Sequence, residues 1–277
     1  MEQLLPAGRA GPPIGALLAL AFIALEFLYG RWRDRDSYDL RETGATLVIV
    51  LGNQLTRWAT AGLAAVPLLW AWDRRLLDIP MNQPLAWAIL FLAVEFTYYW
   101  HHRAMHRVRF LWATHGVHHS ASRLNLTAGL RLGWGSQVSG GFVFYLPLAF
   151  IGFHPLAIVA VLGSGLAYQF FLHTEHAPRL GTLEWVLNTP AHHRVHHASN
   201  DSCLDRNFGG VLIVFDRMFG TFAAAPRHEA LRYGLKNAAV PANRPLAIVA
   251  AGWIAIARGL KDARSVKGIG AAMFGPP

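Results

Sequence analysis

Three short stretches of the chain carry histidines at spacings that suit metal binding. They read HHRAMH at 101–106, HGVHH at 115–119 and HHRVHH at 192–197. In a helix, His193 and His197 lie one turn apart on one face with His196 beside them, so three imidazoles converge on one point. A single histidine is ordinarily a core or surface residue with one hydrogen bond. The recurrence of the pattern in three places predicts a metal centre.

The number of histidines points to two metals and to redox chemistry. Eight imidazoles are about twice what one four-coordinate metal requires. Imidazole binds iron, zinc and copper alike, so the residues alone leave the metal open. Two ferrous ions with open positions can cleave dioxygen and attack an unactivated C–H bond. We therefore expect an oxygenase, with a zinc site or a membrane metal transporter or sensor as the alternatives.

The composition predicts that membrane helices position these histidines. The 277 residues are 53% hydrophobic and only 15% charged, and the apolar residues form long runs. The formal net charge of +9 does not indicate nucleic acid as a partner, because the basic residues flank apolar segments and form no separate patch. The single cysteine, Cys203, excludes an intrachain disulfide and a thiolate-ligated cluster, so nitrogen and oxygen must hold any metal.

Hydropathy predicts an all-α integral membrane protein with about four transmembrane helices and a cytosolic helical cap. After a disordered N-terminus at 1–13, residues 14–29 form a first span that is retained as an anchor. The segment 44–72 is too long for one upright span and is interrupted by Arg57, so we expect an interfacial or tilted entry followed by a span from about Trp58 to Trp72.

The later apolar segments place all the histidine clusters on one side of the membrane. The run 85–100 continues without a breaker into the first cluster, and residues 138–172 form a hairpin split at GFHP. Residues 101–136 contain five arginines and no acid, which predicts a cytoplasmic cap in a multi-pass protein of the bacterial inner membrane. The run FGGVLIVFDRMFGTF is expected as a packed strand or loop of the cap, and 245–260 as a helix lying on the membrane.

The order of the histidine motifs is similar to that of a known superfamily. W-H-H-R-x-x-H, H-x-x-H-H-S and N-T-P-x-H-H-R-V-H-H resemble the fatty acid hydroxylase / sterol desaturase superfamily of integral-membrane di-iron oxygenases. The resemblance covers 85–222 within a single membrane-embedded domain at 14–277. QFFLHTE, LGTLEWVLNTP and FGGVLIVFDRMFGTF are most similar to the branch that includes alkylglycerol monooxygenase and its bacterial relatives.

The resemblance implies a set of nine histidine ligands for two iron ions. They are His102 and His106, then His115, His118 and His119, then His173 on the helix before the last motif, and finally His193, His196 and His197. His101 and His192 fall outside the family spacing, and His176 has no matching position. We expect His154 and His228 to be ordinary.

The resemblance also implies a reaction, namely O₂-dependent hydroxylation of a lipid or sterol-like substrate that enters from the bilayer. Two electrons must come from outside, because the chain shows no haem-binding or flavin-binding segment. A reduced pterin, a cytochrome b5 or a ferredoxin are the donors that the superfamily suggests. Desaturation or oxidative demethylation at the same metals is the alternative outcome, and zinc is an alternative occupant in purified protein.

Several polar residues are candidates to position the ligands or the lipid. Glu95, less than two turns before His102, orients a ligand, lines the substrate entry or makes a buried hydrogen bond. The candidate acceptors for imidazole N–H groups are Glu175, Asn188, Asn200 and Asp201. Contact with an anionic headgroup, or with the membrane generally, is expected for Arg123, Arg131 and Arg194.

Overall fold

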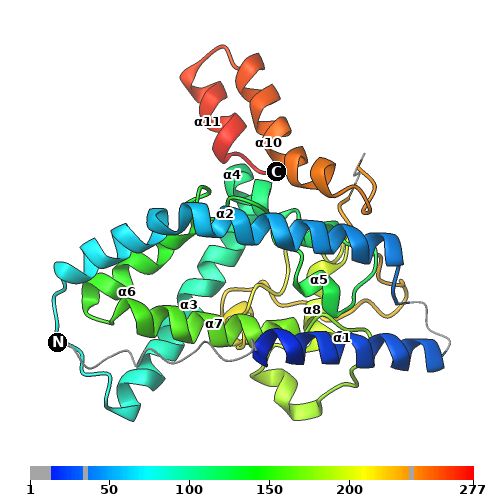
Figure 1. Cartoon of the computed structure of the whole chain (residues 1–277), viewed down its shortest axis with the longest axis horizontal. Coiled ribbons are helices and arrows are strands. Elements are labelled where there is room, and N and C mark those ends of the chain that lie inside the picture. Colours follow the sequence, from blue (N-terminus) through cyan, green and yellow to red (C-terminus); the bar gives the residue numbers. More distant parts are fainter. Residues whose placement is uncertain (1–13, 34–36, 237–239) are drawn as a thin grey trace.

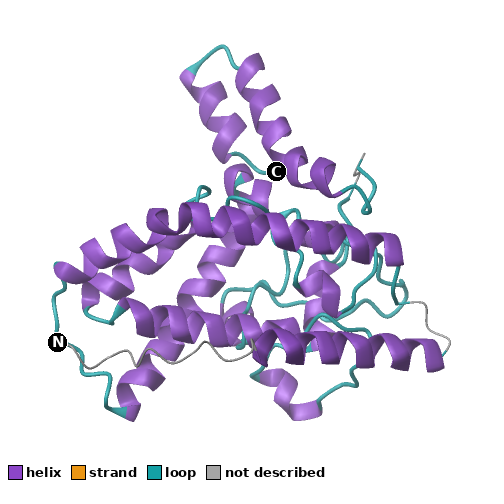
Figure 2. Ribbon diagram, viewed as in Figure 1, coloured by secondary structure: helices purple, strands orange, loops and turns teal. Residues whose placement is uncertain are grey.

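The chain is built from helices, as Figures 1 and 2 show for a computed structural model that describes residues 14–33, 37–236 and 240–277. The long helices are α1 (Ile14–Trp32), α2 (Leu40–Asp73), α3 (Pro84–Arg107), α7 (Pro155–Phe170) and α10 (Pro245–Asp262). Within the described residues there are two isolated β-bridges and no strand. The predicted all-α class is confirmed. The N-terminus predicted at 1–13 lies outside the described residues.

Helix α1 presents apolar side chains around most of its circumference. Leu25 and Leu28 are both more than half exposed, and among the described helices α1 alone is long and apolar enough to cross a membrane by length and composition. Its one acid, Glu26, is buried and accepts hydrogen bonds from the Tyr38 hydroxyl (2.5 Å) and the Leu126 amide (2.8 Å). Glu26 therefore joins α1 to Tyr38 and Leu126 by hydrogen bonds and does not interrupt the helix.

Helix α2 is one uninterrupted helix of 34 residues. Asp39 caps it by accepting hydrogen bonds from the Arg41 and Glu42 amides, which satisfies two of the free N–H groups of the first turn. The predicted interfacial or tilted entry and the span from Trp58 to Trp72 both lie on this one helix, and their positions in a membrane stay a prediction. A lone arginine such as Arg57 does not end a helix, because arginine is among the better helix formers.

The helix that leads into the first histidine motif and the hairpin that turns at GFHP are both present. Helix α3 runs without a break from the apolar segment into the first histidine motif. The hairpin turns at GFHP, where Gly152 has φ 136°, a backbone conformation that favours glycine. Its first arm is divided into the 3-10 helix η2 (Gly141–Tyr145) and the short α6 (Leu146–Ile151), and its second arm is α7. Apolar residues of α2, α3, α6 and α7 pack together in the largest core cluster.

The C-terminal part forms a helical hairpin that projects from the other helices (Figure 1). It consists of α10 and α11 (Val266–Phe274), and α10 packs on α4 (Arg109–His115). Gly252 permits this close contact, because a Cβ there would lie 2.5 Å from the Ala113 Cα. The predicted helix at 245–260 is present, and Ile248 and Val249 are buried against protein. Its position on the membrane surface stays a prediction.

Arg131 lies in the interior of the protein, so its expected contact with a headgroup is wrong. Its side chain is fully buried beside α2, with Nη1 3.7 Å from Glu42 Oε1, and it donates a hydrogen bond to the Ala242 carbonyl. Glu42 Oε1 also accepts a hydrogen bond from the Ser122 amide at 2.8 Å. The pair therefore joins α2 to two loops of the cap.

Replacing Glu42 with alanine is expected to lower the free energy of unfolding by about 3–5 kcal/mol, because it leaves a buried guanidinium without its counter-ion. Thermal or denaturant unfolding of the detergent-purified protein measures this. Glu229→Ala is the matched control, since it breaks an exposed pair with Arg232 (3.1 Å) and is expected to cost at most about 1 kcal/mol. Equal losses in both variants would contradict a stabilising role for the buried pair.

Candidate metal centre

Five structural elements bring the predicted histidines together. Helix α3 carries His102 and His106 in its last two turns, and α4 ends at His115. The 3-10 helix η1 (His118–Ser120) supplies the next two histidines, and His173 follows the end of α7. Helix α8 (Pro190–His197) starts with proline at its first position, which suits a helix start, and carries the third motif.

The nine histidines form two adjoining groups. One group contains His102, His106, His115, His119 and His196, and the other contains His118, His173, His193 and His197. Each histidine offers one ring nitrogen, and within each group these nitrogens all lie within 4.8 Å of one another. The members are the nine residues chosen as ligands from the sequence. None of the other histidines among the described residues belongs to either group.

The two groups share their structural elements, which the sequence does not predict. Helix α8 contributes His193 and His197 to one group and His196 to the other. The expectation that all three meet at one point is therefore wrong. Adjacent residues on a helix, such as His196 and His197, point about 100° apart around its axis, enough to face separate sites that both lie against the helix. His118 and His119 are divided in the same way.

In the five-histidine group, the Nε2 atoms of three imidazoles lie close to the Nε2 atom of His115. His115 Nε2 lies 3.0 Å from His102 Nε2, and 3.2 Å from both His106 Nε2 and His119 Nε2. A neutral imidazole nitrogen offers either one N–H or one lone pair, so His115 Nε2 can satisfy only one of these three neighbours by hydrogen bonding. A shared cation satisfies all of them through their lone pairs.

The four-histidine group repeats this arrangement. His173 Nε2 lies 2.9 Å from His193 Nε2 and 3.2 Å from His118 Nε2, and His193 Nε2 lies 3.1 Å from His197 Nε2. Ligands held at about 2.1 Å from one metal stand roughly 3.0–3.4 Å apart, depending on the angle between them. Two of the three separations lie in that range and the third is 0.1 Å below it, so the donor set fits a metal ion.

One atom of the five-histidine group reinforces this fit. His196 Nε2 is buried and has no hydrogen-bond partner among the described residues. Burial of an unpaired polar nitrogen is costly unless something binds it. The opposite ring nitrogen, Nδ1, is hydrogen-bonded to the Arg206 carbonyl at 2.9 Å, which leaves Nε2 with its lone pair for a metal.

Burial keeps these imidazoles neutral at physiological pH. It lowers the pKa of His115, His119 and His196 well below the usual value, and the neighbouring imidazoles lower it further. Burial lowers the pKa of His173 to about 4, against the opposing effect of its hydrogen bonds to backbone groups. Metals bind the neutral form of imidazole, so the protein environment prepares the site for a cation.

Acidification is expected to destabilise the metal-free protein below about pH 6.5, the usual histidine pKa. The histidine pKa values are lower in the folded state than in the unfolded chain, so the unfolded chain binds more protons between about pH 4 and 6.5. Each such histidine then removes about 1.4 kcal/mol per pH unit as the pH falls. Melting temperatures of chelator-treated protein at pH 7, 6 and 5 measure the effect. A melting temperature that does not change over this range would contradict buried neutral imidazoles.

Backbone carbonyls orient the rings from behind. His102 Nδ1 donates to the Phe208 carbonyl at 2.8 Å, and His173 Nδ1 donates to the Gln169 carbonyl at 2.8 Å if Nε2 is the metal-binding atom. Together with the contact of His196 to Arg206, these bonds fix the ring orientation and the tautomer. His106 Nδ1 instead faces Asp205 Oδ1 at 3.6 Å.

Residues 205–213, which we call the strap, supply three of these acceptors. Asp216 is buried and accepts hydrogen bonds from the Phe208 and Gly209 amides, both at 2.7 Å. Glu95 accepts hydrogen bonds from the amides of Val211 (2.7 Å) and Leu212 (2.8 Å). Glu95 therefore makes buried hydrogen bonds at the end of the strap and does not contact a histidine of either group. The strap continues into the short helix α9 (Val214–Met218), so the run FGGVLIVFDRMFGTF begins as a loop, one of the two expected forms, and contains a helix that was not expected.

The prediction that side chains near the third motif accept hydrogen bonds from imidazole N–H groups is wrong. Asn188 donates to the Gly209 carbonyl, Asn200 bonds the backbone of Ala230 and Arg232, and Asp201 pairs with Lys236 at the surface. Glu175 is exposed and interacts with Tyr233. Asn188 helps to hold the strap, but none of the four contacts a grouped histidine. Asp216 is a functional residue that the sequence analysis did not single out. It is the one acid in the apolar run FGGVLIVFDRMFGTF, and a carboxylate that such a run buries needs hydrogen-bond donors.

The remaining histidines have other partners. His101 stacks on Phe144 with ring centroids 5.1 Å apart. His154 Nδ1 caps α7 by accepting from the Leu156 amide at 3.2 Å, as an ordinary structural histidine would. His176 Nε2 lies 3.0 Å from Ser37 Oγ and outside both groups. His192 lies on α8 and lines a separate pocket.

The helical fold brings together two groups of buried imidazoles that could each hold a metal ion. Residues 87–221 match the fatty acid hydroxylase family model. This match confirms the resemblance seen in the sequence over that region of the chain.

Named relatives agree with this family. The chain is 44% identical over 181 residues to alkylglycerol monooxygenase of Xenopus tropicalis, a match that covers 65% of this chain and 40% of that protein. It is 46% identical over 171 residues to the Homo sapiens alkylglycerol monooxygenase, covering 61% and 37%. It is 29% identical over 159 residues to the ornithine lipid hydroxylase OlsE of Rhizobium tropici, covering 56% and 48%. The chain therefore matches less than half the length of these relatives. No solved structure matches it.

Proposed function

We propose that the protein is a membrane-bound di-iron oxygenase that uses O₂ and two external electrons to hydroxylate a C–H bond of a lipid. The observation that carries this proposal is the pair of adjoining groups built entirely from buried histidines. The nine members are proposed as ligands of two iron ions, five in one group and four in the other. The family of residues 87–221 and the names of the relatives support a lipid as the substrate.

The residues of this chain hold the centre and exclude water from it. All nine imidazoles are at most 9% exposed. The strap and the carbonyl of Gln169 keep ring nitrogens directed at the two groups. When bound, two iron ions supply the activation of O₂ and the oxidation of an unactivated C–H bond. The surrounding protein supplies a rigid set of neutral ligands, so that little rearrangement accompanies turnover.

The external electrons are proposed to come from a reduced pterin, a cytochrome b5 or a ferredoxin. The relatives named alkylglycerol monooxygenase are matched over two-fifths of their length or less, so their substrate and donor are only guides. A lipid or sterol-like molecule that enters from the bilayer is the substrate we propose, because both groups of named relatives act on lipid-type molecules by name.

We propose about four membrane-crossing helices with the metal centre on the cytoplasmic side of a bacterial inner membrane. The broad apolar exposure of α1 and α2 supports this, since Leu51, Leu55 and Trp58 on α2 are each more than 65% exposed. Figure 1 shows α1, α2 and α7 extending along a common direction, as spans of one bilayer would. The arginine-rich segment 101–136 supports a cytoplasmic cap.

Metal analysis tests the proposal first. Elemental analysis and Mössbauer spectroscopy of protein from cells grown on iron-57 are expected to find about two coupled irons per chain. A reconstituted reaction with ¹⁸O₂ is then expected to place one labelled oxygen atom in the lipid product. A product without label would indicate desaturation, and a metal that moves across liposomes would indicate transport. One tightly held zinc per chain would contradict the oxygenase.

A further inference from the structure

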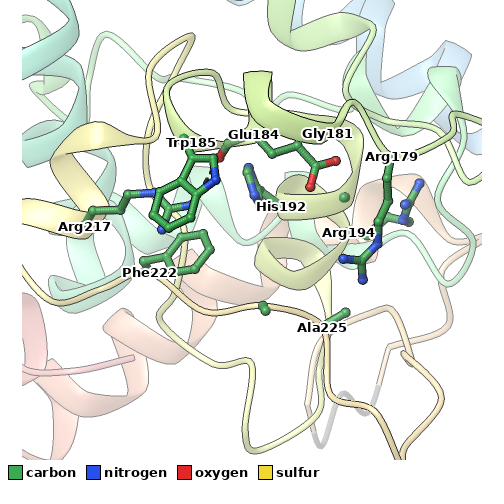
Figure 3. Close-up of a pocket in the computed structure, with 11 residues that line it drawn as sticks. Arg179, Gly181, Glu184, Trp185, His192, Arg194, Arg217, Phe222 and Ala225 are labelled. Carbon is green, nitrogen blue, oxygen red and sulfur yellow. Dashed lines mark hydrogen bonds between the residues drawn. The ribbon is translucent and has the colours of Figure 1, made fainter.

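A small pocket lies behind the metal centre, on the side of α8 that His192 and Arg194 face. Its volume is about 190 Å³, and it lies between α8, α9 and the 3-10 helix η3 (Gly181–Trp185) (Figure 3). Pockets that enclose a whole small molecule generally measure about 300–1,000 Å³. The size therefore suits one chemical group of a larger ligand.

Three guanidinium groups give the pocket its charge. They belong to Arg179, Arg194 and Arg217, and none of them lies within ion-pair distance of a carboxylate among the described residues. Figure 3 shows Arg179 and Arg194 side by side at one end. The one carboxylate in the lining, Glu184, accepts a hydrogen bond from the Leu180 amide at 2.9 Å. The pocket therefore carries an excess of positive charge that an oxyanion would neutralise.

The surrounding contacts hold this charge in place. The Arg217 guanidinium lies over the rings of Trp185 (4.6 Å) and Phe222 (3.8 Å), and it donates to the Glu184 carbonyl at 3.1 Å. The Arg194 guanidinium donates to the Thr174 carbonyl at 3.1 Å. His192 is only 5% exposed, and its buried Nδ1 has no hydrogen-bond partner among the described residues. The pocket therefore has a further polar atom available to a ligand.

Exposed apolar side chains accompany the pocket, and we call them the apolar rim: Trp185 lines the pocket, and Leu183, Val186 and Met218 adjoin lining residues in the sequence. Leu183, Trp185 and Val186 are exposed by 55%, 67% and 50%, and Met218, next to Arg217, by 70%. Exposed apolar side chains adjoining arginines are typical of surfaces at the boundary between headgroups and acyl chains. A soluble anion needs only the guanidinium groups, whereas a lipid uses both the guanidinium groups and the apolar rim.

We propose that this pocket binds the phosphate group of an anionic membrane lipid, with the acyl chains lying against the apolar rim. The proposal rests on the membrane location within the proposed function. The lipid would then contact α8 through His192 and Arg194, the two residues that flank His193 of the metal centre. A bound headgroup would hold α8, and with it three of the proposed metal ligands, against the bilayer surface.

Lipid binding to the full, metal-loaded protein in detergent tests this proposal. Native mass spectrometry with a short-chain phosphatidylglycerol is expected to show one tightly bound lipid per chain. The double variant Arg179→Gln/Arg194→Gln is expected to weaken binding at least about 10-fold, the effect of losing two charge-assisted contacts. The matched control is Arg258→Gln/Arg264→Gln, which removes the same charge from exposed positions near the C-terminus and is expected to bind as the unchanged protein does.

Arg179→Glu is the second variant, because Arg179 is exposed and its replacement leaves the fold intact. It is expected to weaken binding at least as much, by placing a negative charge beside the phosphate. Inorganic phosphate that displaces the lipid at equal concentration would assign the pocket to soluble phosphate and overturn the lipid. Equal binding by all variants, or equal loss in the control, would overturn the site itself. Metal content is measured on the same samples. It tests the proposed function separately, because that function requires two bound metal ions and the lipid site requires none.

Discussion

Replacing His193 with alanine is expected to lower the metal content from about two ions per chain to one or fewer. His193 Nε2 lies 2.9 Å from His173 Nε2 and 3.1 Å from His197 Nε2. Its loss therefore removes the nitrogen that lies between these two proposed ligands. Turnover is expected to fall by roughly 100-fold or more, because the loss of a group that is only hydrogen-bonded to a metal ligand already lowers metal affinity or activity by about 10–100-fold. Elemental analysis and product formation in the same preparation measure both effects.

The control for this change is His154→Ala. His154 is a histidine of the same chain that caps α7 and lies outside both groups. Its loss is expected to cost about 1 kcal/mol of stability through the lost cap and no metal. Unchanged metal content and activity in the His193 variant would remove the basis of the proposed di-iron site.

Replacing Asp216 with alanine is expected to weaken metal binding by about 10–100-fold although Asp216 touches none of the nine histidines. Its carboxylate accepts hydrogen bonds from Phe208 N, Gly209 N and Thr221 Oγ1, each at 2.7 Å. The Phe208 carbonyl in turn holds His102 Nδ1. Removing the carboxylate leaves two buried amides unpaired, which is expected to cost about 2–5 kcal/mol of folding free energy. The rate of metal loss to a chelator, well below the melting temperature, measures the effect.

Asp262→Ala is the matched control, because Asp262 is exposed at the end of α10. It is expected to leave both the chelation rate and the melting temperature unchanged within error. If the Asp216 variant melts earlier but releases metal at the rate of the unchanged protein, Asp216 supports the fold and does not position His102.

The choice of histidines could be made from the sequence, whereas their division between two groups could not. The i, i+4 spacing of His102 and His106, or of His193 and His197, is a local property of one helix. The assignment of His196 to the group of His102 depends on where α3 and α8 meet, and no local pattern encodes that meeting. The course of α2 was likewise not encoded locally, because an apolar pattern interrupted at Arg57 does not reveal that one helix continues through this residue.

The partners behind the histidines were missed for a physical reason. The carbonyls of Phe208, Arg206 and Gln169 are backbone groups, which every residue type carries, so sequence letters do not reveal them. Polar side chains near the third motif are visible in the sequence, but Asn200 bonds the Ala230 carbonyl and Asp201 pairs with Lys236. Arg131 was misplaced similarly, since an arginine reads as a surface residue until its buried partner Glu42 is seen.

Because α8 and the adjacent residues His118 and His119 each serve both groups, occupancy of the two groups is expected to be cooperative. The first ion to enter restricts the same peptide segments that carry ligands for the second, so the second ion meets a lower entropic cost. A population loaded with a single ion should then be scarce during stepwise addition of metal to stripped protein. The chain would pass from empty to fully loaded over a narrow range of metal concentration.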